Sequence, residues 1–81
     1  MSKRYFIFGR STCAFCMHAV DFLEAQEAPY DFLDFANNLE VLEDYKTFYG
    51  QTTVPIILSN DLQTGKVRKV GGYQDLLELL S

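Results

Sequence analysis

The sequence predicts an α/β fold, a four-stranded mixed sheet flanked by three helices. Apolar patterns with the period of a strand alternate along the 81 residues with patterns of helical period, in the order strand, helix, strand, helix, strand, strand, helix. The first two strands, separated by a helix, can pair in parallel through a right-handed crossover. The last two strands, joined by a short turn, can pair antiparallel. At this length we expect one domain, residues 1–81.

The first half of the chain is expected to form a strand, a helix and a second strand. Residues 3–9, KRYFIFG, are an aromatic and β-branched run closed by a glycine, which is typical of a buried strand. Ser11 and Thr12 follow as candidate helix caps. Residues 14–27 then carry apolar positions at intervals of three and four, which indicates an amphipathic helix. Residues 30–35, YDFLDF, alternate as a second strand would.

The second half is expected to form a helix, a hairpin and a last helix. Residues 38–49 have a helical apolar stripe, and Gly50 supplies a stop. Residues 53–58, TVPIIL, predict a strand with its proline near the start. Residues 66–70, KVRKV, alternate valines with cations as a half-exposed antiparallel strand would, and residues 73–80 close the chain as a helix. The aromatic residues expected in the core include Phe6, Phe8, Phe32 and Phe48.

Charge and hydropathy exclude several kinds of partner. Seven Lys and Arg against eleven Asp and Glu give a net charge of −4, which opposes attraction to nucleic acid or to an anionic membrane surface. The apolar run at residues 5–8 is shorter than the roughly 7–15 residues of a signal-peptide core. No window approaches the roughly 18 apolar residues of a spanning helix. We therefore expect a cytoplasmic monomer that binds neither nucleic acid nor membrane.

Both cysteines lie in the stretch STCAFC, where the first strand gives way to the first helix. Cys13 is expected at the amino end of that helix, where unpaired N–H groups and the helix dipole stabilise a thiolate. In such a Cys-x-x-Cys motif the first thiol can have a pKa of about 3.5–7.5 instead of about 8.5. Cys16 lies one turn later on the same face, within reach of a disulfide. We expect Cys13 to be the exposed nucleophile and Cys16 the buried resolving thiol.

Two other uses of the cysteine pair remain open from the residues alone. A structural zinc site needs about four ligands, and the chain offers two Cys and one His, His18, which is expected on the helix surface. A carboxylate would have to complete the set. The thiols could instead be inert packing groups. The position of the pair at a helix start favours redox use, and we expect no metal ligands.

Three motifs occur in an order that resembles the glutaredoxins, small proteins of thioredoxin-like fold. They are STCAFC after the first strand, TTVPIIL at residues 52–58 and VGGYQDL at residues 70–76, so the resemblance covers essentially the whole chain. It implies that Cys13 attacks a disulfide or a glutathionylated thiol and that Cys16 resolves protein disulfides. Glutathione would be the reductant and co-substrate, with no cofactor bound permanently.

The resemblance also implies a glutathione site. Val54 would pair through its backbone with the cysteinyl residue, beside a cis-proline at Pro55 that faces the cysteines. Backbone N–H groups at the start of the last helix would receive the γ-glutamyl carboxylate. Arg10 is a candidate partner for the glycyl carboxylate or for the Cys13 thiolate, and Gln51 is a weaker candidate for the same carboxylate. The full set implied by the resemblance is Arg10, Gln51, Thr53, Val54, Pro55, Gly72, Tyr73, Gln74 and Asp75.

The sequence departs from the family pattern at three positions. Ala14 and Phe15 replace the usual Pro and Tyr between the cysteines, and Gln74 replaces a usual Asp or Ser. Partners implied are glutathione and disulfide-containing or glutathionylated proteins, ribonucleotide reductase being one possible substrate. Two rival hypotheses are a thioredoxin-like electron donor dedicated to one such protein, and a module that holds an iron–sulfur cluster with the help of glutathione.

Overall fold

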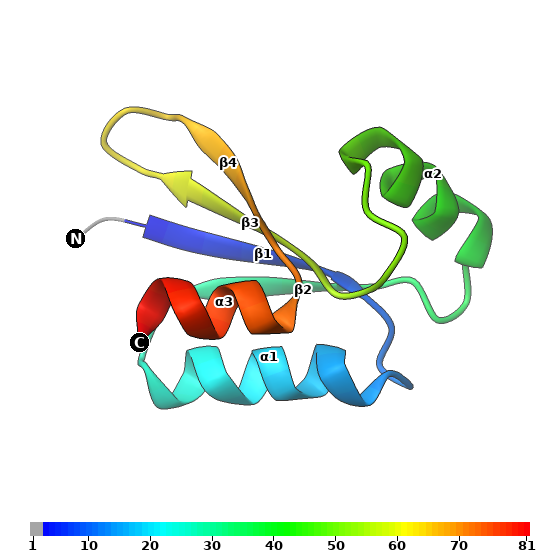
Figure 1. Ribbon diagram of the computed structural model, residues 1–81, viewed down its shortest axis with the longest axis horizontal. Helices are drawn as coiled ribbons and strands as arrows, with labels where there is room; N and C mark the ends of the chain where they lie inside the picture. The colour runs from blue at the N-terminus through cyan, green and yellow to red at the C-terminus, as the bar shows by residue number, and fades with distance from the viewer. Residues whose placement is uncertain (1–2) are drawn as a thin grey trace.

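The seven elements occur in the order predicted from the sequence (Figure 1). The computed structural model describes residues 3–81. The strands are β1 (Lys3–Gly9), β2 (Tyr30–Asp34), β3 (Ile56–Asp61) and β4 (Val67–Gly71). The helices are α1 (Ala14–Ala25), α2 (Leu39–Tyr49) and α3 (Tyr73–Leu80). Three helices and a four-stranded sheet confirm the predicted fold class.

The sheet is mixed, with the strand order β2-β1-β3-β4. β1 pairs in parallel with β2 and antiparallel with β3, and β3 pairs antiparallel with β4, as the connections predicted. The central strands β1 and β3 are covered on both faces, which explains their nearly continuous apolar sequences. Among residues 3–81 no helix is long and apolar enough to cross a membrane.

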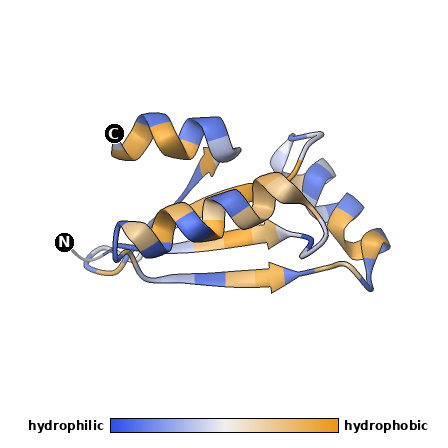
Figure 2. Cartoon of the chain, turned by 90° about the horizontal axis from the view of Figure 1, so that it is seen from below, coloured by the Kyte–Doolittle hydropathy of each residue, from blue (hydrophilic) through white to orange (hydrophobic). Residues whose placement is uncertain are grey.

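The helices divide between the two faces of the sheet, α1 and α3 on one and α2 on the other (Figure 1). Figure 2 shows hydrophobic and hydrophilic residues interleaved along the helices, as expected when one side of each helix is buried. We call the buried set between the sheet and the pair α1 and α3 the first core. It comprises Tyr5, Ile7, Ala19, Leu23, Ile57 and Leu76. The second core, under α2, comprises Phe8, Leu42, Ile56 and Leu58.

An aromatic group surrounds the second core. The ring of Phe8 lies 4.8 Å from that of Tyr45 and 6.0 Å from that of Tyr49, both in edge-on geometry. Phe48 was expected in the core, and that prediction is wrong, because its side chain is 78% exposed. It directly precedes Tyr49, so it projects about 100° away from that residue around the helix. The inward stripe is formed by Leu42, Tyr45 and Tyr49.

Two predicted boundaries differ for reasons of backbone chemistry. Ser11 and Thr12 do not cap α1, because Cys13 occupies the N-cap position. β3 begins at Ile56, three residues later than predicted. Pro55 has no N–H to donate to a ladder, and the Val54–Pro55 peptide bond is cis, as the resemblance implied.

The pattern of β4 was also misleading. The expected alternation placed both valines opposite the cations, although Val67 and Val70 are three residues apart. Residues three apart point to opposite faces of a strand, and the β3–β4 register also shifts between Ile57 and Leu58. Val70 consequently packs on the first core while Val67 is exposed. The cations of β4 are therefore not confined to one face.

Candidate active site

The loop between β1 and α1 holds both cysteines at the carboxyl end of a central strand. The N–H of Cys13 donates to the carbonyl of Arg10 at 3.1 Å, which closes a turn before the helix. Asp34, the last residue of β2, accepts the N–H of Ser11 at 3.0 Å and that of Ala36 at 2.9 Å. A hydrogen bond from the Ser11 side chain, followed by those from the N–H groups of Ala36 and Ser11, lowers the pKa of the Asp34 carboxyl. The loop is thereby fixed to the neighbouring strand.

The two thiols differ in burial, as predicted. Cys13 is half-buried, whereas Cys16 is fully buried. The sulfur of Cys16 packs directly against Gly9, and a Cβ at position 9 would overlap it. Glycine at position 9 is therefore required by this close approach. Cys16 lies behind Cys13, between α1 and the end of β1.

The environment separates the pKa values of the two thiols. Burial alone would raise the pKa of the Cys13 thiol, but hydrogen bonds from Cys16 and Phe15 and the positive charge of Arg10 bring it below its ordinary value. Burial raises the pKa of the Cys16 thiol to about 12, with further increases from its hydrogen bond to Cys13 and from the Cys13 charge. Cys13 is the group prepared to act as a thiolate.

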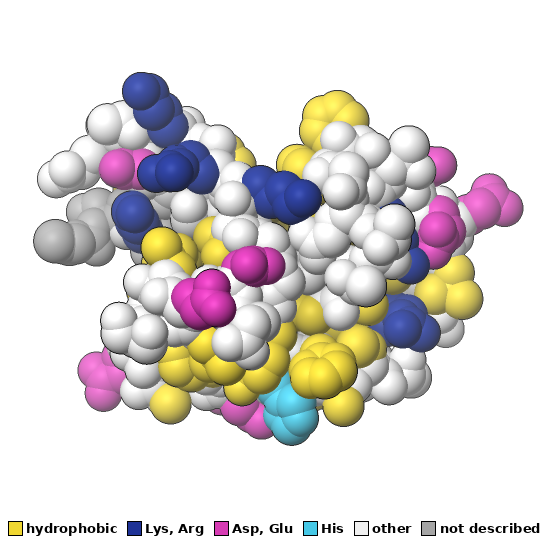
Figure 3. Space-filling model, viewed as in Figure 1, with side chains coloured by type: hydrophobic (Ala, Val, Ile, Leu, Met, Phe, Trp, Pro, Cys, Tyr) yellow, Lys and Arg dark blue, Asp and Glu magenta, His cyan; other side chains and the backbone are white. Residues whose placement is uncertain are grey.

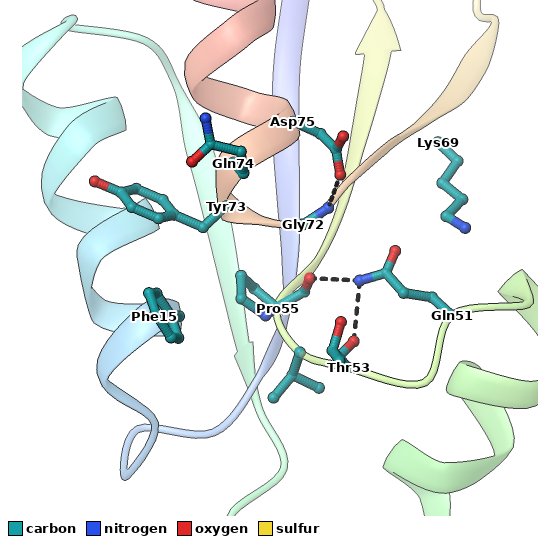
Figure 4. Close-up of a pocket in the computed structure, with 10 residues that line it drawn as sticks. Phe15, Gln51, Thr53, Pro55, Lys69, Gly72, Tyr73, Gln74 and Asp75 are labelled. Carbon is teal, nitrogen blue, oxygen red and sulfur yellow. Dashed lines mark hydrogen bonds between the residues drawn. The ribbon is translucent and has the colours of Figure 1, made fainter.

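A cavity of about 560 Å³ lies beside this loop, within the range of small-molecule sites (Figure 4). All of the residues that the resemblance assigns to glutathione line it, with the exception of Arg10. Arg10 lies instead beside the cysteines, where its charge acts on both thiols. The structure therefore brings the segment before β3 and the start of α3 together at one pocket.

Gln51 supports the floor of the cavity. Its Nε2 donates to the carbonyl of Thr53 at 2.9 Å and to that of Pro55 at 2.8 Å (Figure 4). Its Oε1 is buried and has no hydrogen-bond partner among residues 3–81. Val54 precedes the first residue pair of the β1–β3 ladder, so its backbone groups take no part in that pairing. An extended peptide can therefore add to the chain at Val54.

The start of α3 forms the opposite wall. The carboxylate of Asp75 accepts the N–H of Gly72 at 2.8 Å, which caps the first turn. Gly71 has a φ of 122° and lies so close to that carboxylate that a Cβ would overlap it. The ring of Tyr73 lies 6.1 Å from that of Phe15 and 5.8 Å from that of His18. This contact joins α3 to the cysteine helix.

Two residues that line the cavity were absent from the predicted set. Phe15 forms one wall and is 60% exposed, so an apolar ring is available to a ligand there. Its place between the two cysteines was the signal that could have identified it. Lys69 lines the other end, and its Nζ donates to the carbonyl of Tyr49 at 2.9 Å. Its place just before the VGGY segment gave no such signal.

Comparison with known families decides which class of protein carries this arrangement. The family described as Glutaredoxin matches residues 5–62, which include both cysteines and the cis-proline. The chain belongs to the glutaredoxin family. This glutaredoxin is a thiol–disulfide oxidoreductase, and its Cys-x-x-Cys pair lies where the motif predicted. The comparison with curated proteins gave no match.

Solved structures of other glutaredoxins share the fold. A wheat glutaredoxin superposes with a TM-score of 0.71 at 23% identity, over 94% of this chain and 70% of the wheat chain. Glutaredoxin 1 of Francisella tularensis, solved with cacodylate, superposes with a TM-score of 0.69 at 20% identity, over 98% of this chain and 93% of the Francisella chain. A glutaredoxin of Archaeoglobus fulgidus superposes with a TM-score of 0.67 at 22% identity, over 94% of this chain and 84% of the Archaeoglobus chain. The thioredoxin-like fold of this glutaredoxin is thus shared with proteins of distant sequence.

Proposed function

We propose that this glutaredoxin uses glutathione to reduce protein disulfides and glutathione mixed disulfides through Cys13 and Cys16. The observation that carries the proposal is the cavity beside the cysteine loop. It is lined by Val54, the cis-proline and the first turn of α3. An extended peptide can pair with Val54 while the N–H groups of α3 face a carboxylate. Glutathione, a tripeptide thiol with two carboxylates, has this chemistry.

A glutathionylated substrate needs only Cys13. Its thiolate attacks the glutathionyl sulfur, the substrate disulfide breaks, and the substrate leaves as a thiolate that takes up a proton. A second glutathione thiolate then attacks the enzyme-bound disulfide, which releases Cys13 and forms glutathione disulfide. The sum is one mixed disulfide and one glutathione converted into one free thiol and one glutathione disulfide.

A protein disulfide needs both cysteines. Cys13 attacks one sulfur and forms an intermolecular disulfide, while the substrate disulfide breaks and its other sulfur leaves as a thiolate that takes up a proton. Cys16 then loses its proton and attacks the sulfur of Cys13. The second substrate thiol departs, and the enzyme is left with a Cys13–Cys16 disulfide. Two glutathione molecules reduce it and leave as glutathione disulfide. A compartment held reducing by glutathione, such as the cytoplasm, supplies both, and we propose that the protein acts there as one domain.

The test compares the wild type with Cys13→Ser and Cys16→Ser on two substrates, each with glutathione as reductant. Cys13→Ser is expected to abolish turnover of a glutathionylated peptide and of a disulfide-bonded protein. Cys16→Ser is expected to retain the first activity and lose the second. Activity of Cys13→Ser above the uncatalysed rate would contradict the assignment.

Ribonucleotide reductase is a suitable protein substrate for the same assay, because it tests the rival hypothesis of a dedicated electron donor. A dedicated donor would reduce it with a thioredoxin reductase present and would ignore glutathione. The proposed function predicts that reduction depends on glutathione and not on thioredoxin reductase. A second rival, the cluster-binding module, predicts charge-transfer absorption after anaerobic reconstitution with iron and sulfide, whereas the proposed function predicts none.

A further inference from the structure

Lys69 is the cation of the cavity beside the cysteines. The two charged residues that line the cavity are Lys69, on β4, and Asp75, on α3. Figure 4 shows Lys69 together with Gln51 and Asp75 on one side of Pro55, with Phe15 on the other. The cavity therefore has an apolar end at the cysteine helix and a charged end at the start of α3.

The position of the lysine is fixed by the end of α2. Its Nζ donates to the carbonyl of Tyr49, the last residue of that helix, where the helix dipole favours a cation. An ammonium group has three N–H donors. Among residues 3–81, the carbonyl of Tyr49 accepts a hydrogen bond from this ammonium group, and no carboxylate lies within salt-bridge distance of it. Lys69 thus keeps N–H donors that are able to bind an anion.

The charge balance of the cavity makes this cation necessary for an anionic ligand. Without Lys69 the charged group lining the cavity would be the Asp75 carboxylate, on a chain whose net charge is −4. Glutathione carries two carboxylates and one ammonium group, a net charge of about −1 at neutral pH. Figure 3 shows Lys and Arg side chains gathered over the β3–β4 hairpin, with Asp and Glu side chains on the same face. Within the cavity, the positive charge of Lys69 offsets the repulsion between the Asp75 carboxylate and the carboxylates of glutathione.

The ends of the cavity determine which carboxylate meets the lysine. When the cysteinyl residue of the ligand pairs with Val54, one arm of the tripeptide extends toward α3 and the other toward the cysteine loop. Lys69 and Asp75 both line the cavity, on the side of Pro55 away from Phe15. Arg10 belongs to the cysteine loop and does not line the cavity. The arm that meets Lys69 is therefore the one whose carboxylate faces the first turn of α3.

We propose that Lys69 is a specificity-determining residue whose ammonium group binds the α-carboxylate of the γ-glutamyl residue of glutathione. The inference rests on the proposed function and adds to it a selectivity for disulfides that carry a carboxylate on that arm. A neutral side chain at position 69 leaves the chemistry of the cysteines in place and removes this selectivity.

The experiment measures kcat/KM for three mixed disulfides of 2-mercaptoethanol, with glutathione as reductant throughout. One contains glutathione, one contains 4-aminobutanoyl-Cys-Gly, which lacks the α-carboxylate, and one contains glutathione with an amidated glycine. Lys69→Gln is expected to lower kcat/KM about fivefold for the glutathione disulfide, near the upper end for an exposed ion pair. Turnover of the 4-aminobutanoyl analogue should not change, and Lys69→Arg should restore the preference.

Lys66→Gln is the matched control, because it makes the same charge change on the same hairpin but does not line the cavity. It should behave as the wild type with all three disulfides. An equal loss on all three substrates with Lys69→Gln would overturn the inference in favour of a purely structural role at Tyr49. A loss of preference for the free glycine carboxylate instead would also overturn it. Absence of wild-type turnover with the glutathione disulfide would contradict the proposed function itself.

Discussion

The chemistry of Cys13 and Cys16 differs because their surroundings differ, although they lie one helical turn apart. Cys13 receives hydrogen bonds at the open end of α1 and lies near the charge of Arg10. Cys16 is enclosed between α1 and β1, against Gly9. Removal of water opposes charge on Cys16, and donors favour charge on Cys13. The proposed nucleophile, Cys13, and the proposed resolving thiol, Cys16, are thus distinguished before any substrate binds.

This difference predicts how alkylation depends on pH. Because the pKa of Cys13 is lowered, its thiolate persists to lower pH, and the rate of carboxamidomethylation should reach half its maximum below about 8.5. Cys16, with its pKa raised to about 12, should stay unlabelled over that range. Peptide mass spectrometry after iodoacetamide treatment at each pH measures both. Cys16→Ala, which removes the side-chain donor, should shift the Cys13 midpoint upward. A wild-type midpoint above about 8.5 would refute the prediction.

Gly9 gives a second prediction at the residue scale. In Gly9→Ala the new methyl group overlaps the sulfur of the buried Cys16. Overpacking of this kind typically costs about 1–3 kcal/mol of stability. Removal of the sulfur in the double variant Gly9→Ala/Cys16→Ala should recover part of that loss, as a double-mutant cycle in urea can measure. Additive effects of the two substitutions would show that this contact is not the cause.

At the scale of elements, the sequence predicted the order, type and approximate limits of all seven helices and strands. Periodicity suffices for this because each element buries one face or both. It failed where backbone chemistry decides. β3 starts after Pro55 rather than at Thr53, because Pro55 has no N–H to donate to the ladder. Val67 is a separate case, because it lies three residues from Val70 and so on the other face of β4, as a strict period of two would have predicted.

The candidate site shows the same limit. The motifs predicted the cysteine pair, the segment before β3 and the start of α3, because each is a local sequence. Arg10 was assigned to the ligand from its distance along the chain, but it does not line the cavity. Lys69 was missed because its place depends on two non-local features, the register of β4 and the end of α2 at Tyr49.

At the scale of the whole molecule, the central strands join two cores on opposite faces of the sheet. Ile57 of β3 belongs to the first core, and its neighbours Ile56 and Leu58 belong to the second. Any displacement of β3 therefore disturbs both cores. We expect α2 to unfold together with the pair α1 and α3, although these helices lie on opposite faces.

Leu42→Ala tests this cooperativity. Leu42 is buried in the second core against Phe8, Ile56 and Leu58, so its truncation should lower the free energy of unfolding by about 2–5 kcal/mol. A domain of this size has a free energy of unfolding of about 4–12 kcal/mol in total, so the variant should still fold.

The urea transitions of Leu42→Ala by far-ultraviolet and near-ultraviolet circular dichroism should coincide. The chain has five tyrosines and no tryptophan, and two of them, Tyr45 and Tyr49, lie on α2 and contribute to the near-ultraviolet signal. Leu39→Ala, the same change at an exposed position of α2, should shift stability by less than about 0.5 kcal/mol. Separate transitions in Leu42→Ala would show that α2 unfolds independently and would contradict the joint core.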